Sequence, residues 1–154
     1  MQSSALGHFM RESGPWTYAI VNLAHVLGIA TLFGSILVLD LRLIGAGRRV
    51  PLAALSASVV PVAAAGLCLA ALTGLGLLAT KTTEYVGNPY VFVKFPAIAL
   101  GVGNALVLRG MTAWRAHRDR DLTRSEERRL AIVGGVSLLS WLTAIAAGRM
   151  IAYW

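Results

Sequence analysis

Apolar residues along the chain form four long blocks, and short polar links separate them. The blocks cover residues 16–39, 59–79, 90–114 and 130–153. Each is long enough for a helix to cross about 30 Å of hydrocarbon, which takes roughly 20 residues. Residues 51–58 are rich in Ser and Ala, and they form either an interfacial turn or an extension of the second span. Short links favour antiparallel neighbours. We therefore expect a single all-α membrane domain over residues 1–154, an antiparallel four-helix bundle.

Composition supports the bilayer as the solvent of this chain. Hydrophobic residues make up 56% of it and charged residues only 14%, too little polar surface to cover a soluble domain. The net charge of +7 would suggest nucleic acid in a soluble protein, but the basic residues flank apolar blocks. We expect a lipid environment and no nucleic-acid partner. The single cysteine, Cys68, cannot form a disulfide within the chain.

Arginines are concentrated in the first and third links. Ten of the fourteen basic residues lie there: Arg42, Arg48, Arg49, Arg109, Arg115, Arg118, Arg120, Arg124, Arg128 and Arg129. Cytoplasmic loops of membrane proteins carry the excess of Lys and Arg. This distribution predicts a multi-pass protein of the bacterial inner membrane with both links in the cytoplasm and both termini in the periplasm.

The ends of the spans carry aromatic and charged residues. We interpret the aromatic ones as an interfacial belt, formed by Trp16, Trp114, Tyr153 and Trp154. Asp40 and Arg42 are expected to form an ion pair at the boundary of the first span.

The link at residues 115–129 mixes acidic and basic residues and predicts a solvated lead into the fourth span. Asp121 or Thr123 is expected to cap that helix, and Glu126 stands at capping-box distance from Thr123.

Several polar residues lie inside the spans, where an ionised group is costly and faces the bundle interior by default. Tyr18, Asn22 and His25 lie within about 60° on a helical wheel of the first span. In the expected orientation His25 lies in the outer half of the membrane, as do Lys94 of the third span and Arg149 of the fourth. Three nitrogen bases from three helices are therefore expected to surround one site.

Such a site suits a b-type haem, which needs an axial histidine, a small residue nearby and cations for its propionates. His25 is the candidate iron ligand, and Lys94, a water, a methionine or a second chain is left open as the sixth ligand. A quinone needs the same polar lining. The expected cofactor-binding residues are His25, Asn22, Gly28, Lys94, Asn104 and Arg149.

Other chemistries have weaker support in the sequence. It contains no zinc-ligand spacing, phosphate loop or nucleophile triad, so an intrinsic hydrolase or nucleotide enzyme is not expected, and any enzymatic role is that of an oxidoreductase subunit. Two alternatives stay open: a small transporter or metal-handling protein, and a structural membrane subunit without cofactor. Small residues in the spans favour a homo-oligomer or partner subunits, namely Gly66, Gly74, Gly76, Gly101, Gly103, Gly134 and Gly135.

Three segments resemble a family of small bacterial four-span membrane proteins, most of them uncharacterised. They are AHVLGIATLFGSILVLDLRLIG at residues 24–45, NPYVFVKFPAIALGVGNAL at 88–106, and WLTAIAAGRMIAYW at 141–154. More distantly they are similar to the membrane domain of copper-resistance D-type proteins, although this chain has half the spans and no methionine-rich surface. The resemblance implies a shared polar site at matching positions, which are His25, Gly28, Gly34, Asp40, Arg42, Lys94, Asn104, Gly148 and Arg149.

Overall fold

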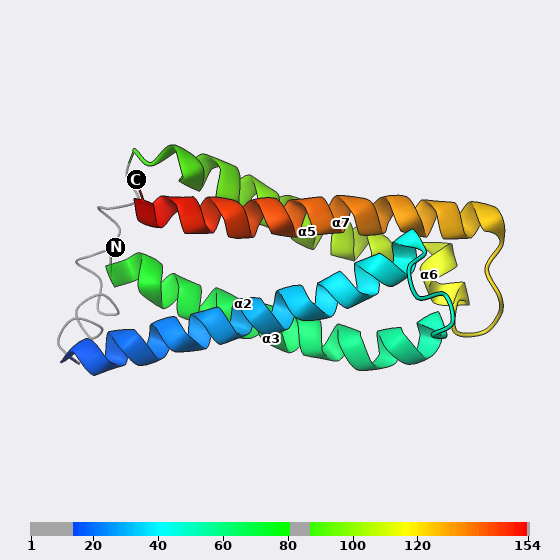
Figure 1. Cartoon of the computed structure of the whole chain (residues 1–154), viewed down its shortest axis with the longest axis horizontal. Coiled ribbons are helices and arrows are strands. Elements are labelled where there is room, and N and C mark those ends of the chain that lie inside the picture. The colour runs from blue at the N-terminus through cyan, green and yellow to red at the C-terminus, as the bar shows by residue number, and fades with distance from the viewer. Residues whose placement is uncertain (1–13, 81–86, 154) are drawn as a thin grey trace. The chain divides into compact units, whose positions relative to one another are not determined.

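The computed structural model describes residues 14–80 and 87–153, and these are almost entirely helical (Figure 1). Its elements are α2 (Gly14–Ile44), α3 (Leu52–Thr80), α5 (Pro89–Gly110), α6 (Thr112–Ala116), α7 (Arg124–Met150) and the 3-10 turn η1 (Ile151–Tyr153). Four of these helices are long and apolar enough to cross a membrane. The predicted class, an all-α four-helix membrane bundle, is confirmed, and the chain is a multi-pass membrane protein.

The helix boundaries refine the predicted spans. The second long helix, α3, begins at Leu52, so residues 52–58 extend the span rather than forming a turn. The third ends at Gly110, because Met111 has extended backbone angles, and α6 follows. The fourth begins at Arg124 rather than at residue 130.

Two local motifs set helix boundaries at the third and first links, one at the start of α7 and one at the end of α2. Thr123 accepts a hydrogen bond from the backbone N–H of Glu126, whose carboxylate accepts one from the N–H of Thr123. Of the two predicted caps, Asp121 and Thr123, the structure therefore has Thr123, with Glu126 completing the predicted capping box. At the end of α2, Gly45 has φ +116°, and Ala46 N–H donates to the Leu41 carbonyl at 2.8 Å. That is a Schellman ending, which favours glycine.

The described residues form two compact units. The first contains residues 14–34 of α2 and 62–80 of α3, which run antiparallel in direct backbone contact. A Cβ on Gly66 would lie 2.6 Å from the Leu32 nitrogen, and one on Gly28 would lie 2.7 Å from the Ala70 nitrogen. Gly66, Ala70 and Gly74 are spaced by four residues, so they share one helix face. Small residues at this spacing let two membrane helices approach closely.

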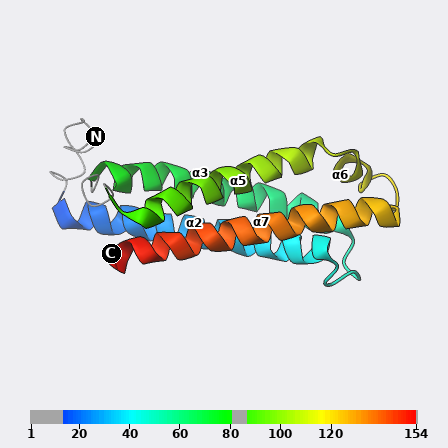
Figure 2. The ribbon, with the colours of Figure 1, turned by 90° about the horizontal axis from the view of Figure 1, so that it is seen from above.

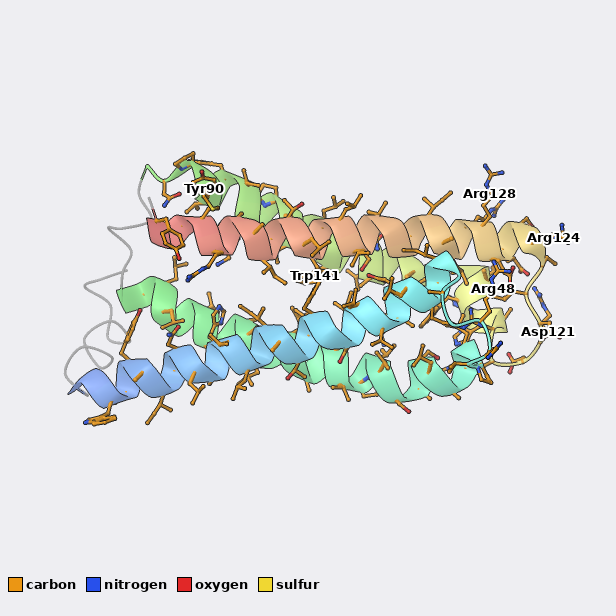
Figure 3. The ribbon with its side chains drawn as sticks, in the orientation of Figure 1. Arg48, Tyr90, Asp121, Arg124, Arg128 and Trp141 are labelled. Atoms are coloured by element: carbon orange, nitrogen blue, oxygen red, sulfur yellow. The ribbon has the colours of Figure 1, made fainter. Side chains whose placement is uncertain are left out.

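The second unit contains residues 35–61 and 89–153, with α5 and α7 antiparallel and side by side (Figure 2). The Trp141 ring of α7 covers Gly101 of α5, where a Cβ would lie 2.9 Å from the indole. Asn104 Nδ2 donates to the Val133 carbonyl at 3.0 Å. In Figure 3, Arg48, Asp121, Arg124 and Arg128 gather at one end of this unit and Tyr90 lies at the other. We call the first of these its arginine-rich end.

A hydrophobic cluster fills the arginine-rich end of the second unit. Its buried members are Leu39, Leu43, Leu108, Ala113, Trp114 and Leu130. Trp114 is only 9% exposed, so its assignment to an interfacial belt is wrong. The break at Met111 explains the difference, because it redirects α6 and buries the indole among leucines. Trp16 and Tyr153 are exposed, as a belt requires.

The backbone contact in the first unit predicts opposite effects on stability when two mid-helix glycines are replaced by alanine. Gly66→Ala is expected to lower the free energy of unfolding by about 1–3 kcal/mol, because its Cβ would meet the backbone of α2. A Cβ at residue 34 would have nothing within 4 Å. Gly34→Ala should therefore raise the free energy of unfolding by about 1 kcal/mol, the difference in helix propensity between glycine and alanine. Detergent-titration unfolding of both variants measures this. Equal effects of the two substitutions would contradict the packing.

Candidate functional site

His25 is held against α3 by a hydrogen bond within the first unit. Its Nδ1 lies 3.1 Å from Thr73 Oγ1, and the ring packs on Gly74, where a Cβ would lie 2.9 Å from Cε1. Thr73 Oγ1 donates at 2.6 Å to the Leu69 carbonyl, which can only accept. The single hydroxyl proton is thereby used, so the Thr73 oxygen accepts from Nδ1–H. This arrangement places a proton on Nδ1 of His25.

That environment fits an imidazole that serves as a metal ligand. Ligating histidines almost always donate their second ring N–H to a protein acceptor, which fixes the tautomer and the orientation of the ring. His25 is half-buried on a membrane-spanning helix. The donor chemistry and orientation of His25 therefore suit an axial ligand of haem iron. Thr73 supports the ring of His25 and was not among the predicted site residues. Its hydroxyl lies next to Gly74 in an otherwise apolar span, and that pattern could have indicated a polar contact.

The other predicted residues of the first unit have different environments. The backbone of Ala70 occupies the space where a side chain of residue 28 would lie. The missing side chain of Gly28 therefore allows the two helices to pack, and it leaves no gap there for a flat ligand. Asn22 is exposed, and Tyr18 is half-buried. His25 is thus the predicted residue with an oriented polar contact to the neighbouring helix.

Lys94, Asn104 and Arg149 belong to the second unit. The half-buried Lys94 side chain lies across Gly148, with Nζ 3.6 Å from the position of a Cβ there. Asn104 bonds to α7, as described above. Arg149 is exposed, donates from Nη2 to the Tyr153 hydroxyl at 2.5 Å, and lies 4.8 Å from the centroid of that ring. Membership of both sets, the α2 residues and these three, in one cofactor site stays a prediction.

Asp40 does not pair with Arg42, so the predicted boundary ion pair is wrong. Asp40 is 3% exposed, with the hydroxyl of Ser137 beside it, and its Oδ2 has no hydrogen-bond partner within the described part of the chain. Arg42 Nε instead donates to the Val50 carbonyl at 2.7 Å. Residues two apart on a helix face different directions, and the chain after the Schellman ending offers Arg42 a closer acceptor.

His117 is a buried residue at the arginine-rich end, not part of a solvated link. Nδ1 donates to the Trp114 carbonyl, and Nε2 lies 2.9 Å from Ser56 Oγ at the start of α3. Its ring also packs on the Trp114 ring at a centroid distance of 4.5 Å. Burial lowers the pKa of His117 below its ordinary value. The residue therefore ties the link after α6 to α3.

Comparisons with known proteins assign no function to this chain. No family model, curated protein or solved structure matches the chain. Among residues 14–80 and 87–153, no group of three or more His, Cys, Asp and Glu side chains lies close enough to hold a metal ion.

The lowered pKa of His117 predicts a specific pH dependence of stability. The unfolded chain takes up the proton near the ordinary histidine pKa of about 6.5, whereas the folded chain resists it. The stabilisation is complete above that pH and is lost as the pH falls towards the folded pKa. The thermal midpoint should fall from about pH 8 to about pH 5, and His117→Gln should fall less steeply. Parallel curves for the two proteins would contradict this assignment.

Proposed function

We propose that the protein is a membrane-embedded electron-transfer module that binds a b-type haem or a quinone through His25. The observation that carries the proposal is the orientation of the imidazole by Thr73 and Gly74 within a membrane span. A membrane-buried ionisable side chain with a dedicated hydrogen-bond partner is a functional candidate by default. Haem, when bound, supplies one-electron transfer between two oxidation states of iron.

The role of each residue follows from its chemistry. His25 would ligate iron, or bind a quinone carbonyl, and Thr73 would hold the ring and raise its basicity by accepting Nδ1–H. Lys94 and Arg149 are the proposed cations for propionate or quinone oxygens, with Asn22 and Asn104 as neutral polar groups of the lining. Gly28 would contribute indirectly, since its contact with Ala70 sets the register between His25 and Thr73.

The visible spectrum of protein purified from haem-replete cells tests the haem form. A Soret band with α and β bands on dithionite reduction is expected, and His25→Ala should abolish them. Thr73→Val keeps the ligand but removes its acceptor, so haem affinity should fall about 10–100-fold. His8→Ala, a residue outside the described ranges, is the matched histidine control and should retain the spectrum.

If the purified protein has no haem bands, the quinone form of the proposal is tested next. Quinone extracted from the purified wild type, and lost from His25→Ala, would support the proposal in that form. Absence of both cofactors from the wild type would overturn it. Ion flux in liposomes would then favour a transporter, and an effect of His25→Ala on stability alone would favour a structural subunit.

The same proposal places the protein in a bacterial inner membrane with both termini in the periplasm. The support is the gathering of arginines at one end of the second unit (Figure 3) together with the tendency of Lys and Arg to stay in the cytoplasm. Within the proposal, the link between α2 and α3 and the link around α6 are cytoplasmic.

Fusions at the C-terminus of the full chain test this orientation. Alkaline phosphatase fused there should be active, since it folds only outside the cytoplasm, and a green fluorescent protein fusion should be dark. A cysteine at Gly47 in a Cys68→Ser background should resist an impermeant maleimide in intact cells and react after lysis. The reverse pattern would contradict the orientation while leaving the cofactor proposal standing.

We also propose that the module works in a homo-oligomer or with partner subunits. Several glycines that suggested such contacts serve packing within the chain, among them Gly66, Gly101 and Gly134. Gly103 and Gly135 have nothing within 4 Å of a built Cβ, so these two positions leave room for a neighbouring helix.

A further inference from the structure

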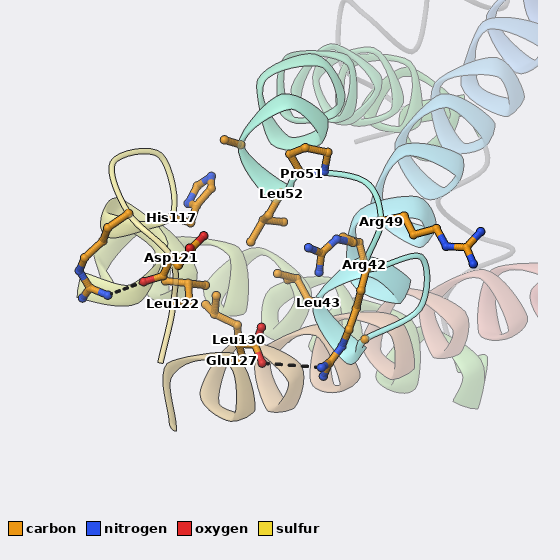
Figure 4. A pocket seen from close by; sticks show the side chains of 14 residues that line it. Arg42, Leu43, Arg49, Pro51, Leu52, His117, Asp121, Leu122, Glu127 and Leu130 are labelled. Carbon is orange, nitrogen blue, oxygen red and sulfur yellow. Dashed lines mark hydrogen bonds and ion pairs between the residues drawn. The ribbon is translucent and has the colours of Figure 1, made fainter. Parts of the chain in front are cut away.

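A cavity of about 340 Å³ lies at the arginine-rich end of the second unit (Figure 4). It is bounded by the end of α2, the start of α3, the chain after α6 and the start of α7. Its volume lies within the range of about 300–1,000 Å³ that small-molecule sites occupy. The proposed cofactor site uses none of its lining residues.

The lining of the cavity combines an apolar side with a cationic side. Leucines from four different segments contribute the apolar side, namely Leu43, Leu52, Leu122 and Leu130. Arg42, Arg48, Arg49 and Arg120 also line it, with Asp121 and Glu127 as the acidic residues. A ligand that fits both sides is an amphiphile with a negative head.

The arginines are not equally available to a ligand. Arg120 is already paired with Glu126, at 2.7 and 3.0 Å, and Figure 4 shows Arg49 directed away from the leucines. Arg42 uses Nε for the Val50 carbonyl, which orients its guanidinium and leaves the two Nη groups as donors. Two donors in a fixed plane match the spacing of two phosphate oxygens.

Arg48 is the second available cation. Its Nη1 lies 3.9 Å from Glu127 Oε2, and its side chain is 67% exposed. A long, exposed ion pair of this kind contributes little to stability. Arg48 can therefore turn to a stronger anion without a large loss. Arg42 and Arg48 together supply a two-cation site beside the leucines.

The position of the cavity indicates which amphiphile it meets. It lies at the ends of helices that are long enough to cross a membrane, which is the depth of the phospholipid headgroups. Basic pockets between spanning helices suit anionic headgroups. A free phosphate would use the arginines but would leave the leucine side without a contact.

From this arrangement we infer that the cavity binds the headgroup of an anionic phospholipid. Arg42 and Arg48 contact the phosphate oxygens, and the leucines contact the glycerol and the first part of the acyl chains. The bound lipid joins the end of α2 to the starts of α3 and α7. This inference does not rest on the proposed cofactor or on His25.

Native mass spectrometry and thermal unfolding of delipidated protein in neutral detergent test the inference. Phosphatidylglycerol should form a one-to-one adduct and raise the thermal midpoint, whereas phosphatidylcholine should do neither at equal concentration. Charge-assisted hydrogen bonds from arginine to phosphate are stronger than hydrogen bonds between neutral groups. Arg42→Gln with Arg48→Gln should therefore weaken the adduct at least about tenfold.

A matched double variant separates a site from diffuse attraction. Arg124→Gln with Arg128→Gln removes the same charge from the same end without touching the cavity lining, and it should bind phosphatidylglycerol as the wild type does. Equal weakening by both double variants would overturn the inference. So would a midpoint rise with inorganic phosphate as large as that with the lipid, because the leucines would then play no part.

Single variants keep the test valid if the cavity double variant unfolds. Arg48→Gln removes an exposed side chain and leaves the Arg42–Val50 contact in place, so the fold should persist while the adduct weakens. Arg42→Lys keeps the charge but loses the planar pair of donors, and it should weaken the adduct more than Arg124→Lys does. Unchanged lipid affinity in both cavity variants would overturn the inference.

Discussion

The backbones of α2 and α3 touch at Gly28 and Gly66, and the first unit depends on that contact. Within lipid, apolar side chains gain little by leaving hydrocarbon for another helix, so helices associate through close packing and a few interhelical hydrogen bonds. Glycine permits both here. With Gly66 against Leu32 and Gly28 against Ala70, the antiparallel register brings His25 over Gly74 and next to Thr73. A shift of one turn along either helix would separate the imidazole from its acceptor. The orientation of the candidate ligand therefore depends on glycine contacts about one and two turns away along the helices.

In the second unit, α5 and α7 also pack closely, but through different residues. A large ring, Trp141, covers Gly101, and Asn104 donates to the Val133 carbonyl, so α5 and α7 are joined by a ring packed on a glycine and by an interhelical hydrogen bond, among other contacts. At the arginine-rich end the chain changes direction twice, and both links use backbone motifs: a Schellman ending at Gly45 and a capping box at Thr123. Residues of both turns line the cavity to which Arg42 belongs.

Two histidines of this chain illustrate how surroundings separate structural from functional candidates. His117 has the Trp114 carbonyl at one ring nitrogen and the Ser56 hydroxyl at the other, and it packs on an indole. Both ring nitrogens are used to hold a link in place. His25 has a hydroxyl acceptor at Nδ1 that is itself fixed by the Leu69 carbonyl, and its proposed role as a ligand rests on that arrangement. Sequence position alone suggested the deeper histidine as the candidate, and the hydrogen bonds supply the chemical reason.

The number of spans, their approximate limits and two candidate caps of α7 could be predicted from the sequence, because these depend on local hydropathy and on residues within one turn of each other. The sequence also identified His25 as the outstanding polar residue of the first span. Only the tertiary structure decided that Asp40 is buried beside Ser137 rather than paired with Arg42, that Trp114 lies in a core, and that Thr73 supports His25. Each of these depends on which residue of another segment lies opposite. Helix register and the direction of the chain after Met111 fix those partners, and neither is encoded in the hydropathy of a single span. The spacing of Gly66, Ala70 and Gly74 was visible in the sequence, but its partner on α2 was not.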